Sequence, residues 1–317
     1  MLTILSITGP IFLLIALGFN AVRFGAMDKG EMRALGKLVI GFALPALLFR
    51  SLSQRSLAEI ANPSYMLAYA AGSLAVMAAA TLFARLVQKK PLQVSALYAV
   101  GMCCSNSGFV GYPILLQTLG HDAAVALALN MTVENVVLLP VLLVLLEGGA
   151  KGGESLASVL AKTARRLATN PMILAIAAGL GFSLTGLRLP DPVFRAVDML
   201  AMASGAVALF AIGGTLVGLK VRGMVGDVAQ IAAGKLILHP LAVGVAMALL
   251  PPMEPAFQAG LILSASVPMM SIYPLFGQRC GQEALCAAAL VTATIASFVT
   301  ISLILWGLGA RGLLPLP

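Results

Sequence analysis

The sequence predicts an all-α polytopic membrane protein with ten transmembrane helices. They form two inverted five-helix repeats, in which helices 4 and 9 are broken and cross. Three observations lead to this prediction: the composition, the long apolar segments and an internal repeat. Of the 317 residues, 60% are hydrophobic and only 10% are charged, whereas soluble domains carry about 25% charged residues. So few charges cannot cover a soluble globule, and so many apolar residues exclude a disordered chain.

Ten apolar segments are long enough to cross the hydrocarbon core of a bilayer, which takes about 20 helical residues. They cover 2–22, 31–52, 64–87, 93–118, 121–146, 168–186, 192–218, 225–250, 256–279 and 283–308. Together they fill most of the chain and leave no room for a soluble domain. The longest connection divides the chain into a first repeat at 1–147, a cytoplasmic linker at 148–167 and a second repeat at 168–317.

The basic residues indicate how these segments are oriented. With the N-terminus outside, fourteen of them fall in the inside loops: Arg23, Lys29, Arg33, Lys37, Arg85, Lys89, Lys90, Lys151, Lys162, Arg165, Arg166, Lys220, Arg222 and Arg279. Five fall outside: Arg50, Arg55, Arg188, Arg195 and Arg311. Because cytoplasmic loops are enriched in Lys and Arg, we expect both termini on the non-cytoplasmic side of the cell (inner) membrane. The same bias explains the net charge of +8 without a nucleic-acid partner.

A constant offset relates the two halves of the chain. The dipeptide Tyr-Pro occurs only at 112–113 and 273–274, which are 161 residues apart. The same offset matches Ser105 with Ser266, Gln117 with Gln278, Gly18 with Gly179 and Phe49 with Phe210. Because this offset spans five helices, an odd number, the second half inserts upside down. Inverted repeats are the architecture of many secondary transporters; a duplicated membrane scaffold without transport is the alternative.

Both repeats carry helix-breaking residues in the middle of a span. Span 4 contains Ser-Asn-Ser-Gly-Phe-Val-Gly-Tyr-Pro at 105–113, and span 9 contains Pro268 and Pro274. Glycine and proline disfavour a continuous helix. Interrupted spans at corresponding positions are the best sequence indication of a transporter's binding site. A proline kink packed against a neighbouring helix is the alternative for each span.

The free backbone groups at such breaks suit charged ligands. The N–H end of the second half-helix is partly positive and suits a carboxylate, whereas the C=O end of the first suits Na⁺ or a hydroxyl. We therefore predict that substrate is bound by Asn106, Ser107, Gly108, Gly111, Tyr112, Pro113, Ser266, Val267, Pro268, Ser271, Tyr273 and Pro274.

Here the chain resembles the bacterial branch of the auxin efflux carrier family. The resemblance rests on the Asn-x-Gly-Phe-x-Gly-x-Pro run at 106–113 and on Leu-Pro-Ala-Leu-Leu-Phe at 44–49, and it covers essentially the whole chain. It implies two crossing broken helices, as in bile-acid sodium symporters and Na⁺/H⁺ antiporters. It also implies a scaffold domain (spans 1, 2, 6 and 7), a transport domain (spans 3–5 and 8–10) that moves past it, and homodimers. The substrates it implies are organic anions such as auxin, malate or malonate.

Glu134 lies near the middle of span 5, where an ionisable side chain is costly and is functional by default. Asn130 lies one turn before it on the same face, and Thr132 and Asn135 are close in sequence. With Ser105 of span 4, these residues form our predicted coupling-ion site, in which Glu134 carries H⁺ or joins an oxygen-rich Na⁺ site. A protonated Glu134 that is hydrogen-bonded to a neighbouring helix is the alternative.

Lys235 and His239 lie one turn apart in span 8. We predict that both face the crossing and neutralise an anionic substrate. Two alternatives stay open: Lys235 snorkels toward the inside surface, and His239 makes a structural hydrogen bond rather than relaying protons.

Other functions fit these residues less well. An intramembrane enzyme needs paired acids or a His-rich metal site, but the chain has only two His, so we expect neither enzymatic activity nor a cofactor. A cation/proton antiporter needs acidic residues near the crossing, and neither break contains one. We therefore predict a secondary carrier of small organic anions, coupled to Na⁺, H⁺ or neither, with a Na⁺-coupled symporter or cation/proton antiporter of the same fold as the alternative.

Overall fold

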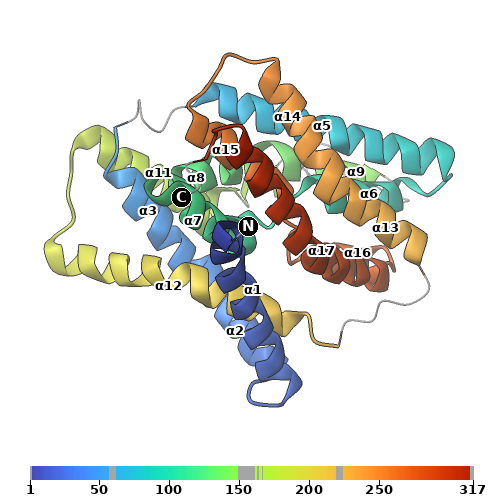
Figure 1. The fold of residues 1–317 in the computed structure, drawn as a ribbon, viewed down its shortest axis with the longest axis horizontal. Coiled ribbons are helices and arrows are strands. Elements are labelled where there is room, and N and C mark those ends of the chain that lie inside the picture. Colours follow the sequence, from blue (N-terminus) through green and yellow to red (C-terminus); the bar gives the residue numbers. More distant parts are fainter. Residues whose placement is uncertain are drawn as a thin grey trace.

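The computed structural model describes residues 2–56, 62–148, 161–162, 164–165, 167–218 and 224–314 (Figure 1). Every element within these ranges is a helix, apart from one isolated β-bridge. This agrees with the all-α class predicted from the composition. Much of the predicted linker at 148–167, including Lys151 and Arg166, lies outside the described residues, as do Lys220 and Arg222.

The helices of the first half are α1 (Leu2–Arg23), α2 (Lys29–Leu38), η1 (Val39–Ala43), α3 (Leu44–Ser53), α5 (Pro63–Leu82), η2 (Phe83–Val87), α6 (Leu92–Cys103), η3 (Ser107–Gly111), α7 (Tyr112–Leu119), η4 (Gly120–Asp122), α8 (Ala123–Val133), η5 (Glu134–Leu138) and α9 (Leu139–Gly148). Those of the second half are α11 (Pro171–Thr185), α12 (Asp191–Thr215), α13 (Val225–Ala233), η6 (Gly234–Leu238), α14 (His239–Ala248), α15 (Pro255–Ser266), α16 (Tyr273–Arg279) and α17 (Glu283–Ala310).

Within the described ranges, seven helical segments are long and apolar enough to cross a membrane. Six of them, at 4–23, 29–53, 63–87, 191–215, 225–248 and 283–310, correspond to predicted spans 1, 2, 3, 7, 8 and 10. The seventh, at 107–146, holds the second half of span 4 and all of span 5, and it turns at Gly120, whose φ is +54°. Span 6 corresponds to α11, with 15 residues, and span 9 to the pair α15 and α16. The count differs from ten because two predicted spans are interrupted and one is short.

Within the described residues, five predicted spans contain a π-helical turn, and a proline explains every one except η2 of span 3. The turns η1, η3, η5 and η6 end two residues before Pro45, Pro113, Pro140 and Pro240. Proline has no N–H, and its ring clashes with the carbonyl four residues back. The residue before each proline donates its N–H five residues back instead, as His239 does to Gly234. Such turns are frequent at functional sites, and three of these hold Ser107, Glu134 and Lys235.

Glycines allow two helix pairs to approach closely. A Cβ on Gly18 of α1 would collide with the carbonyl oxygen of Phe210 on α12. A Cβ on Gly179 of α11 would lie 3.3 Å from the carbonyl oxygen of Phe49 on α3. Gly18 and Gly179 are partners at the 161-residue offset, and so are Phe49 and Phe210. Residues that the repeat matches therefore make matching contacts.

The described helices form two groups that we name by their order in the chain. The first group is α1–α3, α11 and α12, in which α12 packs against α1, α2 and α3, and α11 packs against α3. The second group is α5–α9 and α13–α17, in which α5 packs against α6 and α14. Figure 1 shows α3, α11 and α12 on one side and α5, α6, α13 and α14 on the other. The turn η3 contacts α12, so interrupted span 4 lies at the boundary between the groups.

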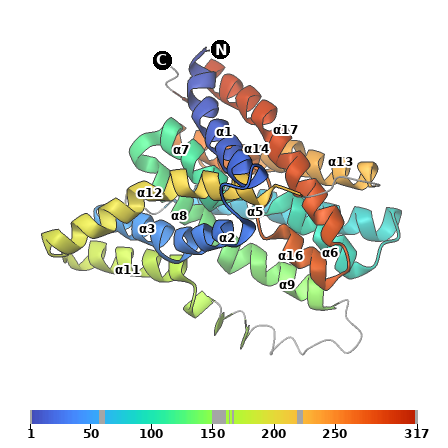
Figure 2. The ribbon, with the colours of Figure 1, turned by 90° about the horizontal axis from the view of Figure 1, so that it is seen from below.

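The start of α1 and the end of α17 lie at the same end of the molecule (Figure 2). These helices, the first and the last of the described chain, also contact each other. The rings of Phe12 and Phe298 meet edge to face with their centroids 4.9 Å apart. This is one of the places where the first group touches the second.

Candidate functional site

The two interrupted spans meet at their breaks. Helix α6 ends at Cys103, and Ser105 then forms an antiparallel β-bridge with Met269, between α15 and α16. Asn106 donates its backbone N–H to the carbonyl oxygen of Pro268 at 2.9 Å. Both spans are therefore interrupted, as predicted from their glycines and prolines, and each break supplies backbone partners for the other.

The crossing lies inside the protein. Ser105, Asn106 and Ser107 are each exposed by 4% or less, and residues 264–269 are buried as well. The backbone leaves the helical conformation at Asn106, where ψ is 58°, and at Val267, where ψ is 156°. Non-helical backbone at membrane depth requires this kind of enclosure or a water-filled cavity.

The carboxylate of Glu134 reaches the crossing from η5. Its Oε1 accepts hydrogen bonds from the Tyr69 hydroxyl at 2.8 Å, the Ser107 hydroxyl at 2.9 Å and the Ser105 backbone N–H at 3.3 Å. Ser107 opens η3, so this carboxylate lies at the partly positive N-terminal end of the second half of span 4. No hydrogen bond from the described residues reaches Oε2 of Glu134.

This position bears on one argument from the sequence. Neither break contains an acidic residue, and we took this as an argument against a cation/proton antiporter, although Glu134 was grouped with Ser105 of span 4 in the predicted coupling-ion site. Glu134 brings an acidic side chain to the crossing from a different span, because η5, which continues α8, packs against α5 beside the break. The missing acidic group can therefore no longer serve as an argument against a cation-coupled carrier.

The ammonium of Lys235 also lies at the crossing. Its Nζ donates to the Ala265 carbonyl oxygen at 2.7 Å and to the Ser105 hydroxyl at 2.8 Å, and it lies 2.8 Å from Nδ1 of His239. The side chain is fully buried. Lys235 therefore does not snorkel to the inside surface.

Two neighbours with opposite requirements lie beside Nδ1 of His239. The Lys235 ammonium, 2.8 Å away, can only donate to this nitrogen, whereas the Ala265 carbonyl oxygen, 3.1 Å away, can only accept from it. The other ring nitrogen, Nε2, lies 2.8 Å from the hydroxyl of Ser73 on α5. His239 therefore lies between the Lys235 ammonium and the Ser73 hydroxyl of α5 and contacts both.

A polar stripe on α5 was missed by the sequence reasoning. Tyr65, Tyr69 and Ser73 are spaced by four residues, so they share one face of the helix. All three are buried. The Tyr65 hydroxyl donates to Asn130 Oδ1 at 3.1 Å and lies 3.4 Å from the hydroxyl of Ser264. The repeated four-residue spacing of polar side chains in an apolar span was the signal that could have revealed this stripe.

Several predicted residues have other partners. The Thr132 hydroxyl donates to Ala128 O, and the amide of Asn135 donates to Met131 O while its oxygen accepts from Asn170. Neither joins Glu134. Likewise, the Ser266 hydroxyl donates to Ile262 O, and the Tyr273 hydroxyl donates to Leu97 O at 2.9 Å.

The remaining predicted residues lie around the crossing. Gly108, Gly111, Tyr112 and Pro113 are buried on the half of span 4 that faces the first group, where Gly108 lies against Leu44 of α3. Val267 and Pro268 are buried in the other break, whereas Ser271 and Pro274 are half-buried.

Two buried side-chain amides have an NH₂ group that donates no hydrogen bond to any described residue. Nδ2 of Asn106 and Nδ2 of Asn130 have no hydrogen-bond partner among the described residues. The exposed fraction is 4% for Asn106 and 0% for Asn130. Buried polar groups are normally paired, so each exception requires an explanation. Asn106 is the more informative of the two, because it lies in the break itself.

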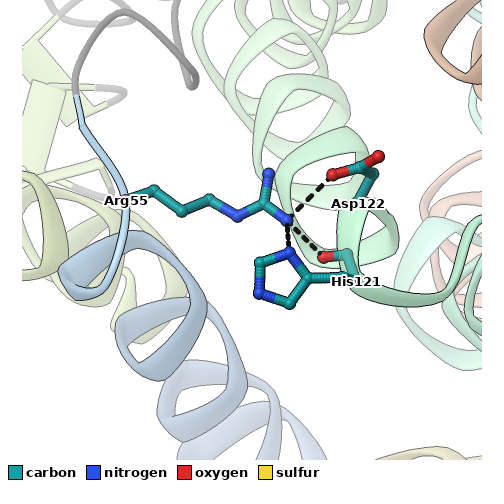
Figure 3. A network of polar contacts seen from close by, with 3 residues as sticks. All are labelled: Arg55, His121 and Asp122. Carbon is teal, nitrogen blue, oxygen red and sulfur yellow. Dashed lines mark hydrogen bonds and ion pairs between the residues drawn. The ribbon is translucent and has the colours of Figure 1, made fainter.

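A further polar cluster links the two groups of helices (Figure 3). Arg55, which follows α3, donates through Nη2 to the backbone oxygen of His121 at 2.8 Å and to Asp122 Oδ1 at 2.9 Å, and it also contacts the His121 ring. His121 and Asp122 form the turn between α7 and α8 in the second group. The Ser183 hydroxyl of α11 donates a hydrogen bond to the Arg55 backbone oxygen.

Two cavities flank this cluster. One, of about 540 Å³, is lined by first-group residues that include Phe49 and Phe182. The other, of about 520 Å³, is lined by Asn62, His121 and Phe257 among others. Arg55 lines both cavities. Sequence reasoning used Arg55 only as a loop charge, because the partners that define it lie more than sixty residues away.

No group of three or more His, Cys, Asp or Glu side chains that could hold a metal ion occurs in the described part of the chain. Oxygen atoms that could surround a monovalent cation converge at the crossing, from Ser105, Ser107, Glu134 and Ala265. Lys235 already occupies part of that space.

Comparison with known proteins adds to this geometry. A family model described as "Membrane transport protein" matches residues 4–305. The chain is 28% identical over 299 residues to the "Putative malonate transporter" of Rhizobium meliloti (strain 1021), covering 94% of this chain and 93% of that protein. It is 27% identical over 246 residues to the "Uncharacterized transporter YfdV" of Escherichia coli (strain K12), covering 74% of each. An "Uncharacterized transporter" of Methanothermobacter thermautotrophicus is 27% identical over 238 residues, which is 73% of this chain and 74% of that protein.

Proposed function

Because this chain belongs to the membrane transport protein family, the auxin efflux carrier family, we propose that it is a secondary carrier of small organic anions. Carboxylates of the malonate or malate type are the first candidates and auxin-like carboxylates the second. The family is one of membrane transporters rather than enzymes. The relative whose name refers to malonate supports the choice of a carboxylate.

The observation that carries this proposal is the buried crossing of two interrupted helices. Non-helical backbone inside a membrane is tolerated only within the protein or along a water-filled cavity, and interrupted spans at corresponding positions of two repeats indicate a transporter's binding site. Here the crossing joins Ser105 to Met269 and gathers Glu134 and Lys235 around it. A passive scaffold has no need for two ionisable side chains at this depth.

A substrate carboxylate binds, in this proposal, on the side of the crossing that faces the first group. The spare N–H donors of Asn106 point to an acceptor ligand, and hydrogen bonds to a charged acceptor are stronger than neutral ones. Tyr112 and Pro113 follow on the same half-helix, and half-buried Ser271 lies in the other break. Glu134 and Lys235 each have hydrogen-bond partners within the protein, so they support the site rather than contact the substrate first.

Transport proceeds by an elevator-type movement of the second group of helices past the first. The contact of η3 with α12 supports this, because it places the crossing at the boundary between the groups. The cluster of Arg55 with Asp122 also spans that boundary. A movement of one group would expose the crossing first to one side of the membrane and then to the other.

We extend the proposal to the arrangement in the membrane. Ten spans in two inverted repeats are supported by the matching contacts of Gly18 with Phe210 and of Gly179 with Phe49. The common end of α1 and α17 supports termini on one side, which the basic residues assign to the non-cytoplasmic side of the inner membrane. We also propose that two copies of the chain form a homodimer through the first group of helices.

The test is transport by the purified protein in liposomes. Radiolabelled malonate, malate and indole-acetate are offered in turn, with imposed Na⁺ or H⁺ gradients. We expect saturable uptake of at least one of them, and loss of that uptake when Pro113→Ala and Pro274→Ala are combined. If no carboxylate moves, the proposed substrate class is wrong.

The position of Glu134 favours a second candidate, a Na⁺-coupled symporter or cation/proton antiporter of the same architecture. A carboxylate beside a helix break, whose second oxygen accepts no hydrogen bond from the described residues, can carry a cation or a proton. Liposomes loaded with a pH-sensitive dye distinguish the candidates. An antiporter changes the internal pH when Na⁺ or K⁺ is added without any organic anion, whereas the carrier proposed above does not.

A further inference from the structure

Lys235 occupies an unusual place for a membrane lysine. Its ammonium has three N–H groups and three partners, all supplied by the protein: Ala265 O, Ser105 Oγ and His239 Nδ1 at 2.7–2.8 Å. No N–H is left to contact a substrate carboxylate. The prediction that Lys235 neutralises the substrate directly therefore does not explain its geometry.

Two of the three partners of Lys235, Ala265 O and Ser105 Oγ, are oxygen atoms of the kind that a free monovalent cation binds. Ala265 lies in the last turn of α15, and Ser105 lies two residues after the last residue of α6. The C-terminal end of a helix carries free carbonyl groups and a partial negative charge, which attract cations. The ammonium thus lies where the first halves of both interrupted spans end.

The counter-charge is also built into the chain. Glu134 lies at the N-terminal end of the second half of span 4, where Ser105 N–H and the Ser107 hydroxyl hold it. Ser105 connects the two sites, since its hydroxyl accepts from Lys235 and its backbone N–H donates to Glu134. One positive and one negative side chain therefore complement the opposite ends of the broken helices.

We propose that the Lys235 ammonium is a covalently attached substitute for the monovalent cation that would otherwise bind between the two interrupted helices. It follows that transport of the organic anion requires no Na⁺. This inference rests on the proposed function for its transport test, but not for its binding test. Lys235 is then a positioning residue, and His239 and Ser73 hold it in place.

The transport test measures exchange of radiolabelled malonate by the full-length protein in liposomes with equal salt on both sides. Wild-type rates should agree within about twofold in Na⁺, K⁺ and choline, because the cation position is already filled. Lys235→Ala should lower the rate in choline about tenfold or more, since Glu134 loses its counter-charge. Ammonium or methylammonium should restore the Ala variant at least about threefold and in a saturable way, because each fits the space left behind.

Two variants control the test. Lys235→Met fills the same space without charge, so it should be inactive in every salt. Lys90→Ala removes a lysine that pairs with Asp227 at 3.0 Å, away from the crossing, and ammonium should not change its rate.

The binding test needs no substrate. Ammonium should raise the melting temperature of detergent-purified Lys235→Ala with a saturating dose dependence, and should leave the wild type and Lys235→Met unchanged. If the wild type moves no carboxylate, the proposed function fails while this measurement still decides the role of Lys235.

Three results overturn the inference. They are wild-type exchange that stops without Na⁺, a Lys235→Ala variant as fast as wild type in choline, and a folded Ala variant that ammonium neither stabilises nor activates. If the Ala variant does not fold in any salt, Lys235→Met decides: wild-type exchange by the folded Met variant overturns the proposal, and its loss in all salts supports it.

Discussion

Lys235 and Glu134 are joined through a single residue, Ser105, which accepts from Lys235 through its hydroxyl and donates to Glu134 through its backbone N–H. The two charged residues come from different halves of the chain. At the 161-residue offset, Ile295 matches Glu134 and Leu74 matches Lys235. The repeat therefore supplies matching breaks, whereas each charged group occurs in one half only.

Replacing Glu134 with Gln keeps the size of the side chain and removes its charge. The Tyr69 and Ser107 hydroxyls can still donate to it, but the buried Lys235 loses the opposite charge that lies on the other side of Ser105. We expect malonate exchange to fall by about tenfold or more. We also expect any stimulation by an imposed H⁺ gradient to disappear.

Glu283→Gln is the matched control. Glu283 is exposed at the start of α17, where it accepts from Gln278, so exchange should stay at the wild-type rate. A Glu134→Gln carrier with full rate and unchanged gradient response would show that this carboxylate has no part in coupling.

Asn106→Ala should weaken substrate binding more than it weakens the fold. The amide nitrogen has no partner among the described residues, so little stability is lost. A hydrogen bond to a charged ligand contributes about 1.5–3 kcal/mol, which corresponds to a KM for malonate about tenfold or more higher. The measurement is the concentration dependence of uptake together with the melting temperature.

Asn170→Ala provides the opposite pattern. Asn170 Oδ1 caps α11 by accepting from Met172 N–H at 2.9 Å, and loss of such a cap costs about 0.5–2 kcal/mol. Its melting temperature should fall while the KM stays constant. An Asn106→Ala variant that behaves like Asn170→Ala would place the amide in the fold rather than in the binding site.

A crosslink between Arg55 and Asp122 should stop transport. Their side chains meet at 2.9 Å across the boundary between the two groups, and the contact must break if one group slides past the other. With the native cysteines replaced, Arg55→Cys combined with Asp122→Cys should lose exchange when a bifunctional, reducible thiol crosslinker long enough to replace the arginine side chain joins them, and should regain it on reduction.

The ion pair of Lys90 and Asp227 provides the control for crosslinking. These side chains meet at 3.0 Å, and both belong to the second group of helices. Lys90→Cys combined with Asp227→Cys should crosslink without loss of exchange. Full exchange by the crosslinked Arg55–Asp122 pair would contradict a sliding movement at this boundary.

Gly18→Ala should destabilise the first group of helices. Its Cβ would collide with the backbone of Phe210 on α12. Backbone atoms cannot move aside as a side chain can, so we expect a loss of about 3 kcal/mol or more. The control is Gly9→Ala on the same helix, where a Cβ would meet nothing within 4 Å. Equal melting temperatures for the two variants would contradict the close packing of α1 on α12.

Much of the candidate site could be predicted from the sequence. Glycines and prolines at 105–113 and 267–274 marked the breaks, and the rarity of charge singled out Glu134 and Lys235. Proximity in sequence was a poor guide to the rest. Each residue turns a helix by about 100°, so Asn130 and Glu134 share a face, whereas Thr132 and Asn135 point to other partners.

By itself, the sequence determined the membrane class, most of the spans and the positions of both breaks, because hydropathy and the backbone limits of proline are local properties. The tertiary structure decided which groups meet. Glu134 and Lys235 belong to different halves, and only the crossing of α6 and α15 brings both to Ser105. Such a meeting depends on how helices pack rather than on any short stretch of chain.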